Sequence, residues 1–416
     1  MYHSWMNKTV PFFSVFLFLL IGNNYAGIPG CTDPVALNYS PAATTNDGSC
    51  IYKEITVIPE MEIRLPDKLV ETSGLIYWDH HIWTHNDNSD VNIYQIDTIS
   101  GNIIQSLSLP GVVNTDWEEI SQDSAYLYIG DFGNNSGGNR EDLNILRVDK
   151  KSLLKGTPLI EKIEFSWSDQ IIGRKAFADT DYDCEAFIVT EDSIYLFTKQ
   201  WISKKTSLYS LPKTPGVHVA KLKATYNVEG LVTGAVLVDS KKLIALCGYS
   251  TALEPFILLL YDFKDQNFFG ANKRKIWIKA ANHQIEGITT ANGLRYYVSN
   301  EYLSLGPFIN IPQKLQIIDL HSYLDNYFNS LTSDTNNLTM NDYIIYPNPA
   351  DDYISLKSNS VNMRSDYHLL DLSGRVIRTG FFSGDEPDIS VSGLTAGIYF
   401  LKICREKCRT YKVIKK

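Results

Sequence analysis

Short apolar runs separated by polar turns recur through the middle of the chain, and this pattern predicts β-strands. Five segments have a small or acidic residue at their third position, and each is followed by a polar turn and a second apolar run. They are TSGLIYW at 72, WEEISQD at 117, CEAFIVT at 184, VTGAVLV at 232 and IEGITTA at 285. The first unit alone predicts four strands, at residues 74–78, 82–86, 92–97 and 103–109.

The spacing of these five units indicates the fold class. Successive units start 45, 67, 48 and 53 residues apart, which is room for about four strands each. We therefore predict an all-β chain with a β-propeller at residues 53–324, in which five blades are visible and six are possible. The long second interval has room for a sixth blade or for a lid loop at residues 168–183. Residues 55–65 are expected to pair into the last blade and close the ring. An irregular β-sandwich with coincidental repetition is the alternative.

From residue 341 onward the pattern changes. Two prolines open YPNPADDYISLKS, a Ser-Gly-Arg turn divides LLDLSGRVIRTG, and ISVSGLTAGIYFLKI repeats the plan. Short strands with regular turn signals predict a small C-terminal β-sandwich at residues 341–416. The polar, unpatterned residues before it predict a linker at 325–340.

Residues 1–26 have the organisation of a secretory signal peptide, which predicts export by the Sec route. Lys8 precedes an apolar run at residues 10–21, and Ala26 and Gly27 follow. A membrane anchor is the alternative, but the run is shorter than the ~20 apolar residues that a spanning helix needs. No later segment is long and apolar enough to span a bilayer. We therefore expect no transmembrane segment in the mature chain.

A loop at residues 27–52 is bracketed by Cys31 and Cys50 and is rich in Pro, Asn, Asp and Gly. Export permits disulfides, so this spacing predicts a stapled loop. Three of its polar residues either hold a calcium ion or bond their own backbone in turns. These residues are Asp33, Asn46 and Asp47.

The chain has four further cysteines. Cys404 and Cys408 flank Arg-Glu-Lys in a hairpin-like tail, where a cross-strand disulfide is sterically reasonable. Cys184 and Cys247 are either buried thiols or a pair, and their spacing leaves both open.

Polar residues stand at equivalent places in the five units. Glu118, Glu185 and Glu286 share one place near the start of the first strand, where the other two units have Ser73 and Thr233. In a propeller the first strand of each blade lines the channel and runs antiparallel to the second, so the start of one and the end of the other lie at one face. Residues near the second-strand ends are Asn86, Asp131, Thr198 and Asn300.

Carboxylates that share one cavity repel each other unless a cation binds or some of them are protonated. Glu, Asp and Asn oxygens suit Ca²⁺, so the sequence predicts a candidate calcium site. The expected ligands are Glu118, Glu185, Glu286, Asn86, Asp131 and Asn300. His85 is the candidate general base near neutral pH, and Lys199 is placed to neutralise an anionic substrate. The alternative is that these side chains cap backbone groups at strand ends.

The composition excludes some functions. A net charge of −9 argues against a nucleic-acid binder, which needs a basic face. The sequence has no G-x-S-x-G, H-E-x-x-H or C-x-x-C signature, which argues against a standard hydrolase. Two hypotheses follow. The first is a binding or interaction module of unknown ligand that uses the channel face or exposed aromatic residues such as Trp78, Trp83 and Trp201. The second is a calcium-dependent hydrolase of esters or phosphoesters.

The C-terminal motifs, in this order, resemble the sorting domain of type IX secretion cargo. They are the Pro-Asn-Pro start, the DLSGR centre, the LTAGIY segment and the closing YKVIKK. The resemblance implies recognition by the type IX secretion machinery and a location at the outer cell surface or in the medium. The residues that carry it include Pro347, Asn348, Pro349, Gly374, Arg375, Gly397, Tyr399, Lys415 and Lys416.

The WEEI and IEGI segments are similar to those of the propeller superfamily that includes esterase-like phytase relatives and gluconolactonase-type calcium hydrolases. This resemblance implies a calcium site that the chain matches in part. The matching positions are Glu118, Glu185, Glu286, Asn86 and Asn300. No complete catalytic set of that superfamily is present, so the resemblance implies no catalytic residue.

Overall fold

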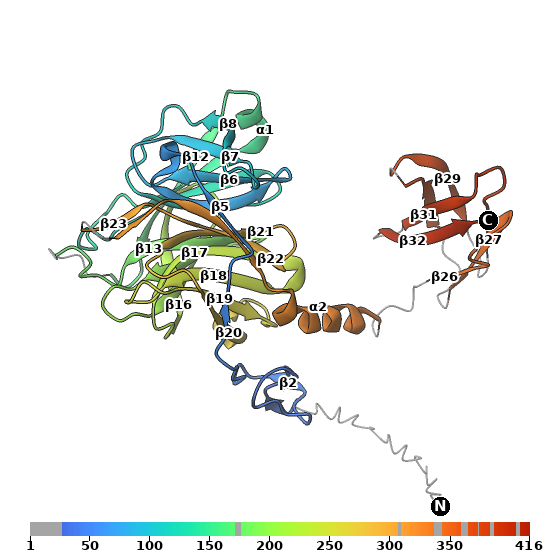
Figure 1. The fold of residues 1–416 in the computed structure, drawn as a ribbon, viewed down its shortest axis with the longest axis horizontal. Coiled ribbons are helices and arrows are strands. Elements are labelled where there is room, and N and C mark those ends of the chain that lie inside the picture. Colours follow the sequence, from blue (N-terminus) through green and yellow to red (C-terminus); the bar gives the residue numbers. More distant parts are fainter. Residues whose placement is uncertain are drawn as a thin grey trace, which may run out of the picture. The chain divides into compact units, whose positions relative to one another are not determined.

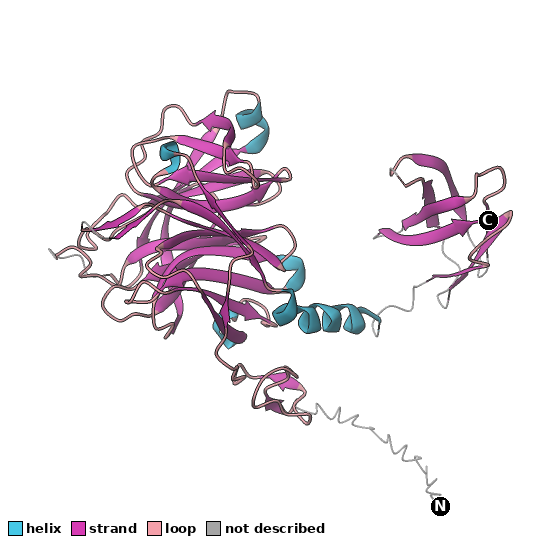
Figure 2. Cartoon of the chain, viewed as in Figure 1, coloured by secondary structure: helices cyan, strands magenta, loops and turns pink. Residues whose placement is uncertain are grey.

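The computed structural model describes residues 27–170, 176–306, 309–336, 343–358, 365–372, 374–382, 387–404 and 408–416. The chain forms two compact units, Met1–Leu324 and Asp325–Lys416, and strands dominate both (Figure 1, Figure 2). The predicted signal peptide, residues 1–26, lies outside the described residues. No helix of the described residues is long and apolar enough to cross a membrane.

The first unit is a five-bladed β-propeller, because its main strands form five sets of four that surround one axis. The inner strands β5, β9, β13, β17 and β21 contact one another in turn, and β21 contacts β5. The five blades, inner strand first, are β5 (Thr72–Trp78), β6 (His81–Asn86), β7 (Asn92–Ile96), β8 (Ile103–Ser108); β9 (Trp117–Gln122), β10 (Tyr126–Asp131), β11 (Asn144–Asp149), β12 (Ile160–Trp167); β13 (Asp183–Val189), β14 (Ser193–Lys199), β15 (Thr206–Pro212), β16 (Gly216–Tyr226); β17 (Leu231–Val238), β18 (Leu243–Tyr249), β19 (Pro255–Tyr261), β20 (Asn272–Ile278); and β21 (Ile285–Thr290), β22 (Arg295–Asn300), β25 (Lys314–Asp319), β4 (Met61–Arg64).

The ring closes as predicted, through a strand from the N-terminal side. β4 pairs antiparallel with β25 and becomes the outer strand of the last blade. The short β3 (Thr56–Val57) extends the neighbouring blade by pairing parallel with β20. The N-terminal end of the propeller sequence therefore supplies a strand to each of the last two blades.

The long second interval holds loops rather than a sixth blade in the residues that the structure describes. Its extra length lies in residues 132–143, in the short helix α1 (Lys150–Leu154) and in residues 168–182, of which 171–175 lie outside the description. The parallel pairing of β12 with β16 joins the second and third blades into one eight-stranded sheet. The described extra residues of this interval thus form loops and a short helix between strands and add no blade.

The N-terminal loop is stapled by the predicted disulfide Cys31–Cys50, with Cα atoms 4.7 Å apart. Its polar residues serve the packing of the loop on the fourth blade. Asp33 Oδ2 accepts hydrogen bonds from the hydroxyls of Tyr52 and Tyr261, and Asn46 Nδ2 donates to Asp262. Of the other cysteines, Cys184 and Cys247 are buried free thiols.

The predicted linker is largely helical. Helix α2 (His321–Asn336) covers most of residues 325–340. Leu324 and Phe328 lie four residues apart in this helix and are buried, which is the spacing of one helix face.

The second unit contains two sheets around one core, as a sandwich requires. One sheet has β26 (Tyr343–Tyr346), β27 (Tyr353–Ser358) and β30 (Asp388–Ser390), and the other has β28 (Ser365–Leu370), β29 (Val376–Phe382), β31 (Gly397–Cys404) and β32 (Cys408–Lys415). Their shared core includes Ile354, Leu369 and Leu401. Cys404 and Cys408 face each other in the β31–β32 register, but their side chains lie outside the described residues.

Small residues surround the propeller axis. Gly74, Ala186, Gly234 and Gly287 occupy, in four inner strands, the place of Glu119 in the fifth. A Cβ atom added at Gly74 would lie 2.5 Å from Glu119 Oε1, and one added at Gly287 would lie 2.4 Å from the carbonyl oxygen of Ser73. The strands approach too closely for larger side chains at these positions.

Glu119 fills the axis and ties blades together across it. Its side chain is fully buried. Oε1 accepts from Ile120 N at 2.9 Å, and Oε2 accepts from Ala235 N, in β17, at 2.7 Å. Burial raises the pKa of Glu119 well above its ordinary value, and the backbone hydrogen bonds that the carboxyl accepts act in the opposite direction.

Replacing Glu119 with Ala should destabilise the propeller by about 2–3 kcal/mol, because buried backbone N–H groups lose their acceptor. Tryptophan fluorescence during urea unfolding isolates the propeller, because every tryptophan other than Trp5 lies between residues 78 and 277. Glu164→Ala, at an exposed position of β12, is the matched control and should change stability little. Equal midpoints for the two variants would show that Glu119 does not hold the axis.

Candidate functional site

Each inner strand carries a β-bulge at the same place, near the start of the strand. The register shifts fall between Thr72 and Leu75, and across the single residues 118, 185, 233 and 286. A bulge inserts one residue and re-aims its side chain. The bulged positions are Ser73, Glu118, Glu185, Thr233 and Glu286, which are the equivalent positions predicted from the sequence.

The bulges leave a cavity of about 170 Å³ at one end of the channel. Ser73 and Thr233 bridge neighbouring blades, since their hydroxyls donate to the carbonyl oxygens of Glu118 and Ile285. The three glutamates line the cavity, together with Ser73, Asp87 and Glu301. Its remaining walls include Asn135, Phe177, Trp201, Tyr249 and Gln284.

Carboxylate oxygens in this cavity are close enough to hold a metal ion. One oxygen each of Asp87, Asp116 and Glu118 lie within 4.8 Å of one another, and the same holds for Glu118, Asp183 and Glu185. Glu118 and Glu286 are only 4% and 7% exposed. Glu118 Oε1 and Glu286 Oε2 have no hydrogen-bond partner among the described residues. Buried carboxylate oxygens without donors are unfavourable unless a cation balances them.

Burial and mutual repulsion raise the pKa values of several carboxyls that line the cavity. Burial, with the charge of Asp116, raises the pKa of Asp87 to about 8. Burial, with the charge of Glu286, raises the pKa of Glu301 to about 9. The pKa of Glu118 is raised well above its ordinary value by burial and then by Glu185. Such shifts in a cleft mark a functional-site candidate.

Lys199 is the only cation among the described residues that line the cavity. Its Nζ lies 2.5 Å from Glu185 Oε2, and the rings of Trp201 and Tyr249 flank it at 4.9 and 5.3 Å. Burial opposes the charge of Lys199, but attraction to Glu185 and Glu286 outweighs it and raises its pKa. One positive side chain therefore faces a large excess of acidic ones.

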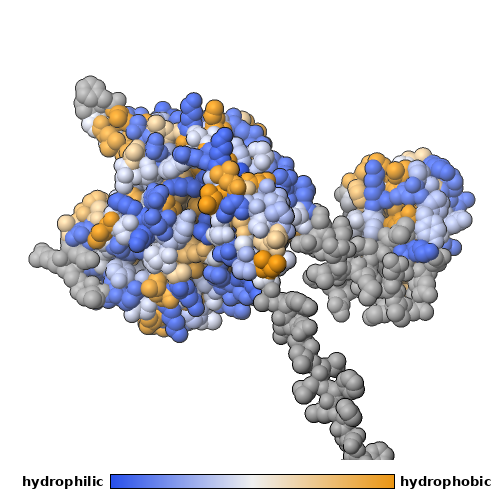
Figure 3. Space-filling model, turned by 90° about the horizontal axis from the view of Figure 1, so that it is seen from below, coloured by the Kyte–Doolittle hydropathy of each residue, from blue (hydrophilic) through white to orange (hydrophobic). Residues whose placement is uncertain are grey.

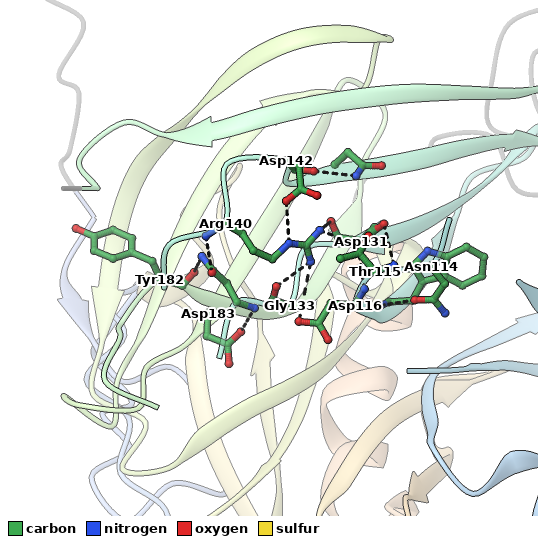
Figure 4. A network of polar contacts seen from close by, with 12 residues as sticks. Asn114, Thr115, Asp116, Asp131, Gly133, Arg140, Asp142, Tyr182 and Asp183 are labelled. Carbon is green, nitrogen blue, oxygen red and sulfur yellow. Dashed lines mark hydrogen bonds and ion pairs between the residues drawn. The ribbon is translucent and has the colours of Figure 1, made fainter. Parts of the chain in front are cut away.

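Arg140 holds the Asn- and Gly-rich loop that follows β10 at the edge of the cavity (Figure 4). Its guanidinium donates to Asp131 Oδ1 and Asp142 Oδ1 and to the carbonyl oxygen of Gly133, and it lies 4.0 Å from Asp116. The loop is also tied to the third blade, because Asn134 N donates to Asp183 Oδ1 at 2.6 Å. This network fixes the carboxylates that approach the cavity from loops.

The structure brings together three of the six predicted ligands, Glu118, Glu185 and Glu286. The other three lie one strand face away and make structural bonds. Asn86 Nδ2 donates to the carbonyl oxygen of Lys68, Asn300 Nδ2 donates to that of Pro312, and Asp131 binds Arg140.

Three of the four predicted strand-end positions are one residue short of a cavity residue, because successive side chains of a strand alternate between faces. The cavity residues that follow them are Asp87, Lys199 and Glu301. In the fourth blade, for which no strand-end residue was predicted, Tyr249 lines the cavity. Asp116 directly precedes the inner strand β9, and Asp183 is the first residue of the inner strand β13. Their acidic character was visible in the sequence, but their approach depends on the loops.

His85, the predicted general base, is fully buried and does not line the cavity. Its ring meets Trp117 edge-on at 5.8 Å, and burial lowers its pKa to about 4. Two of the aromatic residues predicted as exposed are core residues, since Trp78 and Trp83 are 9% and 3% exposed and pack on each other. Trp201 is partly exposed at the cavity. On the face seen in Figure 3, hydrophobic residues form separate small patches among hydrophilic ones.

The fold and the cavity define a class: a five-bladed propeller with an acidic pocket at one end of its channel. Residues 344–416 match the family of secretion system C-terminal sorting domains. This unit is therefore a type IX sorting domain, and it directs the chain to the cell surface or the extracellular space. No curated protein matches the chain significantly.

Solved structures with a similar fold are distant. The PQQ-bound aldose sugar dehydrogenase of Streptomyces coelicolor is 10% identical with a TM-score of 0.38, and the alignment covers 63% of this chain and 97% of that one. The RRP9 WD40 repeats are 10% identical with a TM-score of 0.34, covering 64% and 100%. BamB of Moraxella catarrhalis is 11% identical with a TM-score of 0.25, covering 59% and 57%. The propeller architecture is established by the strand pairing itself.

In EDTA the cavity should make the propeller less stable as the pH rises. The folded pKa values of Asp87 and Glu301, about 8 and about 9, lie above the ordinary values of 3.8 and 4.5. The folded state therefore holds more protons than the unfolded state between about pH 4 and pH 9, and stability falls through that window. The melting temperature should drop from pH 5 to pH 8 by less in Asp87→Asn than in the wild type. Asp97→Asn, at a partly exposed position of the same blade, should keep the wild-type slope, and equal slopes in all three proteins would contradict the prediction.

Proposed function

We propose that the exported propeller binds Ca²⁺ in the acidic cavity and that the bound ion anchors the ligand of the propeller. One observation carries this proposal. Bulges at equivalent positions turn Glu118, Glu185 and Glu286 into one cavity, where two of the three have a buried oxygen with no partner in the described part of the chain. Calcium takes six to eight oxygen ligands in a flexible arrangement, which suits this many carboxylates.

The supporting charge argument uses the environment of the same groups. Only Lys199 among the described lining residues opposes the carboxylates, and it is already paired with Glu185. A cation releases the repulsion that otherwise keeps these carboxyls protonated. The ion would also leave coordination places for an oxygen of a ligand on the solvent side of the cavity.

Hydrolysis of an ester or phosphoester is the second candidate. It is favoured by the composition of the cavity wall, where Lys199 and the partly exposed Trp201 stand beside the carboxylates. A bound ion polarises a carbonyl or phosphoryl oxygen or activates water, and Lys199 is placed to neutralise an anionic group. A binding module needs the ion and the cavity but performs no turnover.

Calcium should raise the melting temperature of the purified chain, and EDTA should lower it. Binding to the folded state alone contributes about 2.7 kcal/mol at a free Ca²⁺ concentration 100 times Kd. Glu185→Gln and Glu286→Gln should each lose most of this shift, whereas Glu254→Gln, on an exposed loop, should retain it. Elemental analysis that finds no calcium, together with a melt that EDTA leaves unmoved, would refute calcium binding.

Turnover of p-nitrophenyl phosphate and p-nitrophenyl acetate distinguishes the two candidates. A calcium-dependent hydrolase should release nitrophenol only with Ca²⁺, and Glu185→Gln and Glu286→Gln should lower the rate at least 100-fold. Calcium binding without turnover of either ester would favour the binding module. A calcium-independent rate that survives in both variants would place any hydrolysis outside the cavity.

A further inference from the structure

Two sets of three carboxylates at the cavity are each arranged closely enough to bind a metal ion, and the two sets share one residue. Asp87, Asp116 and Glu118 form the first, and Glu118, Asp183 and Glu185 form the second, each with one oxygen per residue within 4.8 Å. The groups combine the ends of three blades, since Asp87 follows β6, Glu118 is the bulge of β9 and Glu185 is the bulge of β13. Glu118 is the common vertex. A carboxylate has two oxygens and can bind one ion with each.

Glu118 also has the bonding expected of a bridge. It is 4% exposed and comes from a bulge that turns it toward the cavity. Its Oε1 has no hydrogen-bond partner among the described residues. The buried orphan oxygen is an observation independent of the clustering, and it indicates a missing cationic partner.

The number of charges favours two ions. The cavity and its two groups contain seven carboxyls: Asp87, Asp116, Glu118, Asp183, Glu185, Glu286 and Glu301. Lys199 balances one, and Arg140 near Asp116 is already engaged by Asp131 and Asp142. With all seven ionised, a single divalent cation leaves four carboxylates uncompensated. A second cation leaves two, one of which is the neighbour of Arg140.

We propose that the cavity binds two divalent cations side by side, bridged by Glu118, and that the pair together binds an oxyanion of the phosphate class. This inference rests on the calcium binding proposed above. Adjacent ions in two-metal sites lie about 3.5–4 Å apart, a separation that lets two oxygens of one phosphate bind both ions. Lys199 on the cavity wall is the third cationic group beside the two proposed ions.

Stoichiometry separates this inference from the calcium proposal. Calcium titrated calorimetrically into the purified chain should give two ions per chain. Asp87→Asn should leave one, and Glu118→Gln should lower the affinity for both at least tenfold. One ion per chain would overturn the bridged pair and keep the calcium site, whereas no binding would overturn both. Two ions that persist in Asp87→Asn and Glu118→Gln would place them elsewhere and overturn the inference.

A spectroscopic measurement on the unmodified chain protects the test against misfolded variants. Mn²⁺ also prefers oxygen ligands and is a suitable probe. Two Mn²⁺ ions bridged by a carboxylate should give an exchange-coupled electron paramagnetic resonance spectrum. The six-line spectrum of isolated Mn²⁺ at a loading of two ions per chain would overturn the bridge.

Inorganic phosphate tests the ligand class. Phosphate titrated into the chain loaded with two equivalents of Mn²⁺ should bind at least tenfold more tightly than to the chain loaded with one. Asp87→Asn, which retains a single ion, should show only the weaker binding. Equal affinity at both loadings, or no phosphate binding by the doubly loaded chain, would overturn the oxyanion assignment.

Discussion

The rest of the propeller depends on the hydrogen bonds that the carboxyl of Glu119 accepts at the axis. Five inner strands converge so closely that four of them have Gly or Ala beside the axis, and only one long side chain fits. Glu119 fills that space and accepts N–H groups from its own strand and from β17. The axis is thus closed by hydrogen bonds from backbone N–H groups to the carboxyl. A hydrophobic residue of similar size would leave these N–H groups without an acceptor.

Glu119 blocks the channel at the axis and so forms the bottom of the cavity. The repeated bulge positions lie next to this bottom, which is why the repeat places polar side chains at one site. The bulged residue lies directly before the axial residue in every inner strand, so its side chain faces the space above the bottom of the cavity. Where that residue is Ser or Thr, the hydroxyl bonds the next blade. Where it is Glu, an ionised carboxylate has no hydrogen to donate to that carbonyl oxygen, and the side chain lines the cavity. The choice between hydroxyl and carboxylate at one repeated position therefore sets the charge of the site.

The sequence predicted the repeat better than it predicted the directions of side chains. Apolar runs and turns mark the blades because their spacing depends on strand length, which all five units share. The bulge positions of Glu118, Glu185 and Glu286 followed from the same alignment. At the second-strand ends a slip of one residue exchanges the two faces, so Asn86 and Asn300 were chosen in place of Asp87 and Glu301. The positions of Asp116 and Asp183 near the cavity depend on loop contacts with Arg140 and Asn134. Those contacts could not be predicted from the repeat pattern.

If the acidic cavity binds calcium as proposed, export determines how much of the ion is available to it. The sorting domain directs the chain to the cell surface or beyond, and extracellular calcium modules commonly bind with Kd values of about 10⁻⁴–10⁻³ M. A site of that affinity has little ion to bind inside a cell, where the buried carboxyls stay protonated or repel each other. Without ions, the crowded carboxyls lower the free energy of unfolding of the propeller. If the proposed ions bind only after export, their binding raises it again outside the cell. The same crowding that makes the cavity unfavourable when empty would then make its function depend on the compartment.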